Sequence, residues 1–300
     1  MKAAFSIQTD ARGHHVCVND LGQVQYDYSV PPPMQRQTLP LAHLQVGHVY
    51  RSENSFENVL TVAPSALARL LCPEEGGQRL LISHWETTPQ GNFGAAIGVG
   101  DAAALFEFGT LLRVLYEEWP ARPGTAQERG LVKPSYLVTR DTEPQWRECH
   151  LICVGGPEAN YATGRVGDKL REKRQLRYWF EGYSIVDLAS TNSARFVYSP
   201  AQPDDQRIPG TDYCMLAWLP NPLRTQAGTR SCWIFAGCQT YGTLAAIDAF
   251  SNAEFVSGLA NLAQQGYFQL ILKGSWEEAE HIPWPTSVEL VVEPYTLPPS

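Results

Sequence analysis

The chain has 300 residues, of which 44% are hydrophobic and 18% charged, and its formal net charge is −8. This composition is too apolar for a disordered chain, and the length allows a large buried core. The acidic balance argues against a nucleic-acid backbone or an anionic membrane surface as the main partner, although a local basic patch is compatible with it.

Three further features bear on location. The longest relevant apolar run, residues 102–115, is interrupted by Glu107 and Arg113 and is too short to span a bilayer. The first six residues lack the apolar core of a signal peptide. The seven cysteines are an odd number, and several lie in apolar runs, which favours reduced, buried thiols. We therefore expect a cytoplasmic protein without a membrane partner.

The first thirty residues predict short β-strands. Residues 16–18 and 24–28 flank a glycine-containing loop, which indicates a hairpin. Three consecutive prolines at 31–33 end any sheet and indicate a linker. We predict a small N-terminal β appendage with its linker over residues 1–38, followed by an α/β ligand-binding domain over residues 39–300.

From residue 39 onward, strands alternate with helices. The predicted strands are the apolar runs at residues 80–84, 151–154, 178–180, 195–198, 213–219 and 232–236. Continuous apolar runs are typical of a parallel sheet covered on both faces. Helices are predicted at 101–119, with Asp101 as N-cap, after residue 158, at 243–250 and at 253–265. The runs at 268–272 and 288–292 predict a closing antiparallel pair.

Three of these strands lead through a glycine-containing turn into a helix. The turns lie at residues 98–101, 155–160 and 237–243. Such a turn places backbone N–H groups and the positive end of a helix dipole at the carboxyl end of a sheet, where anionic or polar ligands bind. Because right-handed crossovers place such turns on one side, we expect all three at the same sheet edge.

The turns and two later motifs resemble a prokaryotic α/β domain family of uncharacterised chemistry. The matching motifs are Gly-x-Gly-Asp-Ala at 98–102, Gly-Gly-Pro-x-x-Asn at 155–160, Asp-Tyr at 212–213, Pro-Asn-Pro at 220–222, and Ala-Gly with Gly-Thr within 236–243. The resemblance covers residues 80–292 and implies a Rossmann-like α/β fold with a mainly parallel sheet flanked by helices. More distantly, the layout resembles Rossmann-like sensors of nucleotide derivatives, by analogy of fold alone.

The predicted ligand-binding residues are those of the turns and the polar residues beside them: Gly98, Gly100, Asp101, Gly155, Gly156, Pro157, Asn160, Asn221, Gly237, Cys238, Gly242 and Thr243. Asn160 and Thr243 can bind a ligand or simply cap their helices. Asn221 stands between two prolines, an unusual place for a purely structural asparagine. The turn at 98–101 lacks the third glycine of a dinucleotide fingerprint, so no cofactor is predicted.

A metal site is not predicted either. Cys149, His150 and Cys153 are metal-ligating residue types, but the histidine faces the other side of the strand from the two cysteines, and no second ligand cluster follows.

Three functions remain open. We expect a small anionic, nucleotide-like ligand to be bound without turnover, in a sensing or regulatory role, because no nucleophile–base pair is recognisable and no catalytic residue can be assigned. The first alternative is a nucleoside or sugar-nucleotide hydrolase or transferase that uses Glu86, Asp101 or an acidified Cys238 at the same place. The second is an interaction scaffold in which the turns are only tight turns. A homodimer or a protein partner is compatible with these functions, and direct nucleic-acid binding is not expected.

Overall fold

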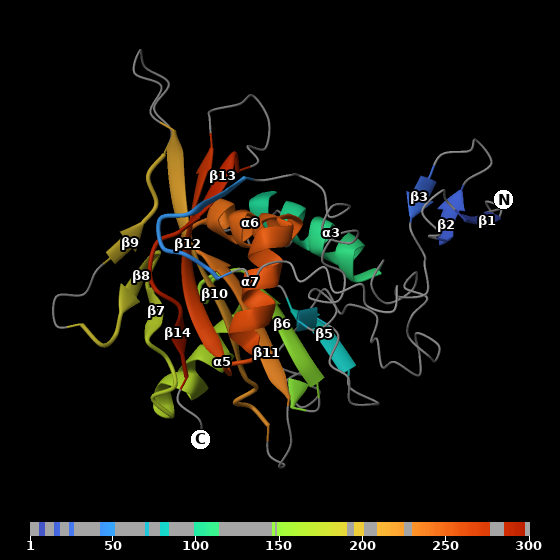
Figure 1. The fold of residues 1–300 in the computed structure, drawn as a ribbon. Coiled ribbons are helices and arrows are strands. Elements are labelled where there is room, and N and C mark those ends of the chain that lie inside the picture. Colours follow the sequence, from blue (N-terminus) through green and yellow to red (C-terminus); the bar gives the residue numbers. More distant parts are fainter. Residues whose placement is uncertain are drawn as a thin grey trace, which may run out of the picture.

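The structure of the chain is a computed structural model, and Figure 1 shows its elements. It describes residues 6–9, 15–18, 24–26, 43–51, 70–71, 79–83, 99–113, 146–147, 149–190, 195–200, 209–224, 230–276 and 285–297. Within this part of the chain, no helix is both long and apolar enough to cross a membrane.

An eight-stranded sheet forms the centre of the fold. Its strands are β4 (Val49–Arg51), β5 (Arg79–Ser83), β6 (Cys149–Val154), β10 (Gly210–Pro220), β11 (Ser231–Gly237), β12 (Phe268–Trp276), β13 (Ser287–Leu290) and β14 (Tyr295–Thr296). Their order is β4-β13-β12-β10-β11-β6-β5, and β14 also pairs with β12. The closing antiparallel pair predicted from the sequence is confirmed as β12 and β13.

The prediction of a mainly parallel, Rossmann-like sheet is wrong. Only β11 with β6 and β6 with β5 are parallel pairs, and the other pairs in this sheet are antiparallel. The central strands β10 and β12 run antiparallel and are nevertheless buried along most of their length. A continuous apolar run therefore indicated correctly that both faces are covered, but it carried no information on strand direction.

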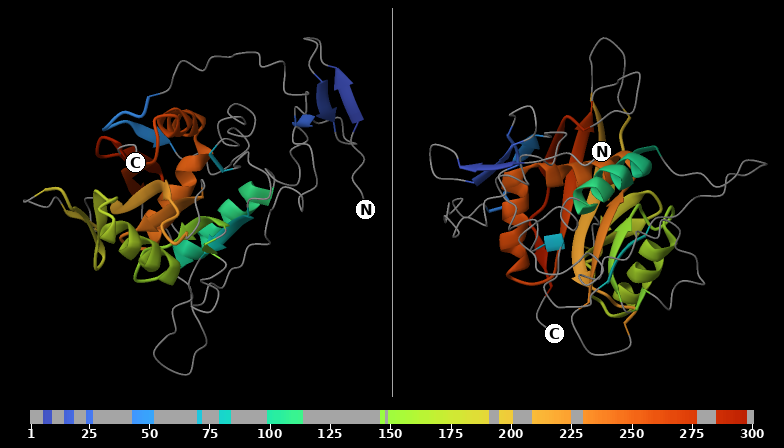
Figure 2. Two further views of the ribbon diagram at one scale, coloured as in Figure 1. Left: turned by 90° about the horizontal axis from the view of Figure 1, so that it is seen from below. Right: turned by 90° about the vertical axis from the view of Figure 1, so that its right-hand side faces the viewer.

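Helices cover one face of the sheet, and a helix together with a second sheet covers the other. The first face carries α3 (Val99–Arg113), α6 (Thr240–Asp248), the short 3₁₀ helix η3 (Ala249–Ser251) and α7 (Ala253–Ala263). The second carries α5 (Tyr161–Glu172) and the sheet formed by β7 (Tyr178–Glu181), β8 (Ser184–Asp187) and β9 (Arg195–Val197). Figure 2 shows α7 and α5 on opposite sides of the central strands.

The side chains of β11 alternate between the two faces of the sheet and contribute to both hydrophobic cores. Trp233 and Phe235 pack into the core under α3, α6 and α7, whereas Cys232, Ile234 and Ala236 pack into the core under α5 and β7. Side chains of a strand alternate between faces, so a strand covered on both sides is apolar at every position. All seven residues of β11 are buried accordingly.

Asparagine caps begin two of the helices. The Asn160 side chain accepts from the amides of Ala162 and Thr163 and so begins α5, while Asn252 accepts from Phe255 and begins α7. Asp101 does not have the predicted N-cap position, because α3 already starts at Val99 and Asp101 is in its first turn. The strands β4, β8 and β14 were not predicted.

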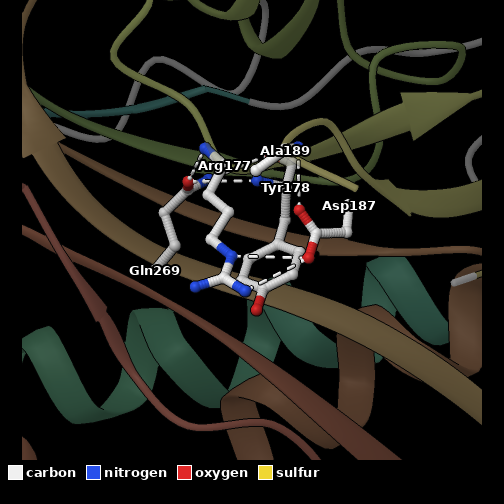
Figure 3. Close-up of polar contacts among 5 residues, drawn as sticks. All are labelled: Arg177, Tyr178, Asp187, Ala189 and Gln269. Atoms are coloured by element: carbon white, nitrogen blue, oxygen red, sulfur yellow. Dashed lines mark hydrogen bonds and ion pairs between the residues drawn. The ribbon is translucent and has the colours of Figure 1, made fainter. Parts of the chain in front are cut away.

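The buried side chain of Gln269 on β12 attaches the second sheet to the first. Its Oε1 accepts from the amides of Arg177 and Tyr178 at 2.7 and 3.3 Å, and its Nε2 donates to the Tyr178 carbonyl at 3.0 Å. Figure 3 shows these contacts beside the ion pair of Arg177 with Asp187. The amide side chain of Gln269 therefore substitutes for a backbone partner at the beginning of β7.

The N-terminal segment contains an antiparallel sheet of β1 (Ser6–Thr9), β2 (His15–Val18) and β3 (Val24–Tyr26). The hairpin prediction is confirmed by the antiparallel pairing of β2 with β3. The proposed boundary between residues 38 and 39 lies outside the described residues and stays a prediction.

Candidate functional site

The turns after β6 and β11 meet the start of α3 at one sheet edge. The Gly155 amide donates to the Phe235 carbonyl at 2.8 Å, and a Cβ on Gly156 would lie 3.2 Å from the Gly237 carbonyl oxygen. A Cβ on Gly100 would lie 2.5 Å from the Thr240 carbonyl oxygen, so α3 and α6 are in close contact here. Gly98, the other glycine predicted at this turn, lies outside the described residues.

Close packing explains most of the glycines at this edge. A side chain on Gly237 would overlap the backbone of Gln239 and Thr243, and one on Gly242 would overlap the Tyr213 carbonyl. Gly155 instead has a φ of +100°, a conformation that L side chains rarely adopt. These glycines are required for the turns to form, whether or not a ligand is present.

The side chain of Asp212 already satisfies the amino end of α6. Its carboxyl oxygens accept from the amides of Gln239 at 3.0 Å and Gly242 at 2.6 Å, and also from its neighbour Tyr213 at 2.8 Å. A carboxylate at a helix N-terminus is the arrangement that the helix dipole favours. Burial raises the pKa of Asp212 to about 7, although these amide hydrogen bonds oppose the rise.

Asp101 is the second buried carboxyl group at this edge. Its backbone amide donates to Thr240 Oγ1 at 2.7 Å, and its side chain receives hydrogen bonds from Thr243 and Thr240. Burial outweighs these bonds and raises the pKa of Asp101 to about 6. The residue is 8% exposed, and its Oδ1 has no hydrogen-bond partner within the described part of the chain. A buried oxygen of this kind is costly for the fold unless something else binds it.

Aromatic side chains lie beside the two carboxyl groups. Tyr241, in the first turn of α6, packs against Trp276 with ring centroids 4.8 Å apart, and Tyr198 stacks on the same indole at 5.9 Å. Burial raises the pKa of Tyr198, and so does electrostatic interaction with Tyr241 and Asp212. Tyr198 and Tyr241 are both half-buried.

The other predicted polar residues have structural partners. Besides capping α5, Asn160 donates to the Val154 carbonyl at 2.8 Å, and Thr243 Oγ1 accepts from the Gly237 amide at 3.1 Å. Pro157 is half-buried in the turn that follows Gly156. These three residues do lie at the edge where the turns meet.

Asn221 does not lie at that edge. It follows β10, whose last residue pairs with Ser231 at the start of β11, so it lies at the opposite end of the sheet. There its Nδ2 donates to the carbonyls of Trp146 and Cys149, and its Oδ1 accepts from Leu223. Its position between two prolines therefore serves a buried loop junction.

The thiol of Cys238 is not acidified. Burial and the charge of Asp212 raise its pKa to about 12, and its Sγ donates to the Phe196 carbonyl at 3.2 Å. The rise contradicts the expectation that the helix N-terminus would activate this thiol, since the thiolate is the nucleophilic form. Glu86, the other catalytic alternative, lies outside the described residues.

The cysteines and histidine of β6 are structural neighbours in the sheet. Cys149 and Cys153 are free thiols, as are the other three cysteines whose side chains are described. His150 bonds to Ser231 instead of sharing a ligand position with either cysteine. Over the described residues, no group of three metal-ligating side chains comes together.

Tyr198, Tyr241 and Asp212 are residues of this edge that the sequence reasoning did not include among its site residues, and a signal was available for Asp212. The available signal was an acidic residue at the start of a long apolar strand, where an ionised group needs a partner. No family model matches the chain, and no curated protein or solved structure matches it either.

Proposed function

We propose that the chain binds a small, nucleotide-like ligand at the edge where the Gly155–Gly156 turn, Asp101 and the start of α6 meet. The observation that carries the proposal is the buried Oδ1 of Asp101, which lacks a partner among the described residues. A sugar hydroxyl or an amino group of the ligand would donate to this oxygen and satisfy it.

The surroundings of Asp101 indicate how such a ligand would be oriented. An aromatic base would lie against Tyr241 or Tyr198, which are half-buried beside the carboxyl groups. Its phosphate would lie at Gly156, before the twelve-residue helix α5, because Asp212 already occupies the amino end of α6.

A hydrolase or transferase at the same place is the second candidate. It is favoured by the pKa of Asp101, which lies at about 6 and close to the pH at which a general acid or base works best. Asp101 would then exchange a proton with the ligand group that it binds. We rank binding first because Cys238, the nucleophile considered for this edge, is held as a thiol.

Calorimetry with a panel of nucleosides and nucleoside monophosphates tests the proposal. Asp101→Asn keeps the shape of the side chain and should abolish or strongly weaken binding, whereas Asp168→Asn, an exposed site on α5, should leave the dissociation constant unchanged. Absence of binding to every panel member, or equal binding by both variants, would contradict the proposal.

Chromatography of the ligand after incubation separates the two candidates. Recovery of intact ligand from the wild-type protein supports binding in a regulatory role. Consumption of a panel member, lost in Asp101→Asn and retained in Asp168→Asn, would establish the enzyme instead.

A further inference from the structure

A histidine and a serine form a buried pair at the opposite end of the sheet. The Nδ1 of His150 on β6 lies 2.8 Å from the Ser231 hydroxyl, and it accepts from the Ser231 amide at 3.1 Å. Because Nδ1 is an acceptor, the neutral ring carries its hydrogen on Nε2. Both residues are less than 9% exposed, and the pair joins the first residues of β6 and β11.

Two arginines lie beside this pair. Arg224 and Arg230 stand at the two ends of the connection between β10 and β11, which is closed by the 2.8 Å bond from the Asn221 amide to the Arg230 carbonyl. Desolvation, together with the smaller effects of the Arg230 and Arg224 charges, lowers the pKa of His150 to about 4. Both guanidinium groups are therefore close enough to the imidazole to act on it electrostatically.

A third cation approaches from the end of α5. Lys173 Nζ donates to the Pro222 carbonyl at 3.4 Å, close to Arg224 in the chain. Lys173, Arg224 and Arg230 thus place positive charge at this end of the sheet, in a chain whose formal net charge is −8.

Within the described part of the chain, no carboxylate forms an ion pair with Arg230. The ion pairs found there use other cations, and Arg230 Nε is buried without a hydrogen-bond partner among those residues. Residues 225–229, which join the two arginines, are Thr-Gln-Ala-Gly-Thr and contain no acidic side chain. A buried guanidinium nitrogen is normally bonded to an oxygen, and an oxyanion satisfies it best.

We propose that Arg230, beside the His150–Ser231 pair, binds a phosphate-type oxyanion, with the positive charge of Arg224 in support. A guanidinium group suits a tetrahedral oxyanion because it can donate two parallel hydrogen bonds to it, and a second positive charge nearby favours a doubly charged anion. Lys173 adds positive charge from the end of α5. This site lies at the other end of the sheet from Asp101 and does not depend on the function proposed there.

Calorimetric titration of the full chain with inorganic phosphate tests the site, at constant ionic strength adjusted with sodium chloride. A phosphorylated sugar is titrated in parallel, because it distinguishes a site for phosphate monoesters from one for the free ion. We expect saturable binding by the wild-type protein. Arg230→Gln should weaken it about tenfold or more, as expected for the loss of charge-assisted hydrogen bonds. Arg171→Gln, an exposed arginine on α5, is the matched control and should bind like the wild type.

A second readout keeps the test valid if Arg230→Gln folds poorly. Phosphate beside the arginines neutralises their effect on the imidazole, so saturation with phosphate should raise the pKa of His150 measured by NMR. The charge-conserving Arg230→Lys should bind with intermediate affinity, because it loses the fork of parallel donors. Lack of saturable binding by the wild type, equal affinities for Arg230→Gln and Arg171→Gln, or a His150 pKa that phosphate leaves unchanged would each overturn the proposal.

Discussion

The amide of Gly242 donates a 2.6 Å hydrogen bond to Oδ2 of Asp212, a residue thirty positions earlier in the chain. A carboxyl group from the central strand β10 therefore caps the helix that follows β11. A Cβ on Gly242 would lie 2.4 Å from the Tyr213 carbonyl oxygen and 3.0 Å from that same carboxyl oxygen, so this position requires a glycine. The fold thus supplies its own carboxyl group at the start of α6, which is why the proposed site has its phosphate at the turn before α5.

Removal of the Asp212 carboxyl should destabilise the fold. In Asp212→Ala, the amides of Tyr213, Gln239 and Gly242 lose their acceptor, which is expected to lower the free energy of unfolding by about 3 kcal/mol. Urea unfolding at pH 3.5, below both the raised pKa of about 7 and the ordinary value of 3.8, measures this effect with the carboxyl group neutral in the folded and the unfolded chain. Asp168→Ala, at an exposed site, should change the midpoint much less, and equal midpoints would contradict this role.

Asp101 should make stability depend on pH. Its pKa is raised from 3.8 to about 6, so the folded chain holds this proton more tightly than the unfolded chain. The stabilisation from proton binding is complete below pH 3.8 and is lost as the pH rises through about 6. Asp101→Asn cannot titrate and should therefore gain up to about 3 kcal/mol of unfolding free energy over the wild type between acidic and alkaline pH.

Urea unfolding at pH 4, 6 and 8 measures this difference. The gain of Asp101→Asn over the wild type should grow with pH, whereas Asp168→Asn should follow the wild-type curve. A constant offset at the three pH values would show that Asp101 does not titrate as described. When a buried carboxyl group serves a function, the variant with a neutral residue in its place is expected to be more stable than the wild type.

The sequence predicted individual elements better than their connection. The pattern of apolar residues located β6, β10 and β11 correctly, because burial on both faces makes every position of a strand apolar. Strand direction depends instead on which strands become neighbours, and β12 returns to the centre beside β10 from far along the chain. Nothing in the residues of β10 distinguishes an antiparallel neighbour from a parallel one, so the parallel sheet was predicted wrongly.

The candidate site was predictable to a similar extent. The prediction that the glycine turns lie together is correct for Gly156 and Gly237, because β6 and β11 are parallel and end at one edge. Asn221 was misplaced because its strand, β10, runs in the opposite direction. Asp212 was missed because its partners are backbone amides near Gly242, and no local sequence pattern reveals a contact with the backbone thirty residues away.

A methyl group at Gly237 should disrupt the turn. Gly237→Ala places a Cβ against the backbone of Gln239 and Thr243, which cannot move as a side chain can, so we expect a loss of several kcal/mol, about 3 or more. Gly109→Ala is the matched control in α3, where a Cβ meets nothing within 4 Å and should stabilise the helix by about 1 kcal/mol. Thermal unfolding of the two variants should therefore shift in opposite directions, and a shift in the same direction would contradict the close packing of this turn.

The last prediction concerns Gln269, which is fully buried and holds β7 against the main sheet. Gln269→Leu has a similar size but leaves the amides of Arg177 and Tyr178 and the Tyr178 carbonyl without this partner (Figure 3). Each buried polar group left unpaired costs about 1–3 kcal/mol, so unfolding should become easier by about 3 kcal/mol or more. Hydrogen exchange of the Arg177 and Tyr178 amides should accelerate at the same time. The exposed Gln265→Leu is the control, and unchanged exchange at both amides in Gln269→Leu would show that β7 is held by other contacts.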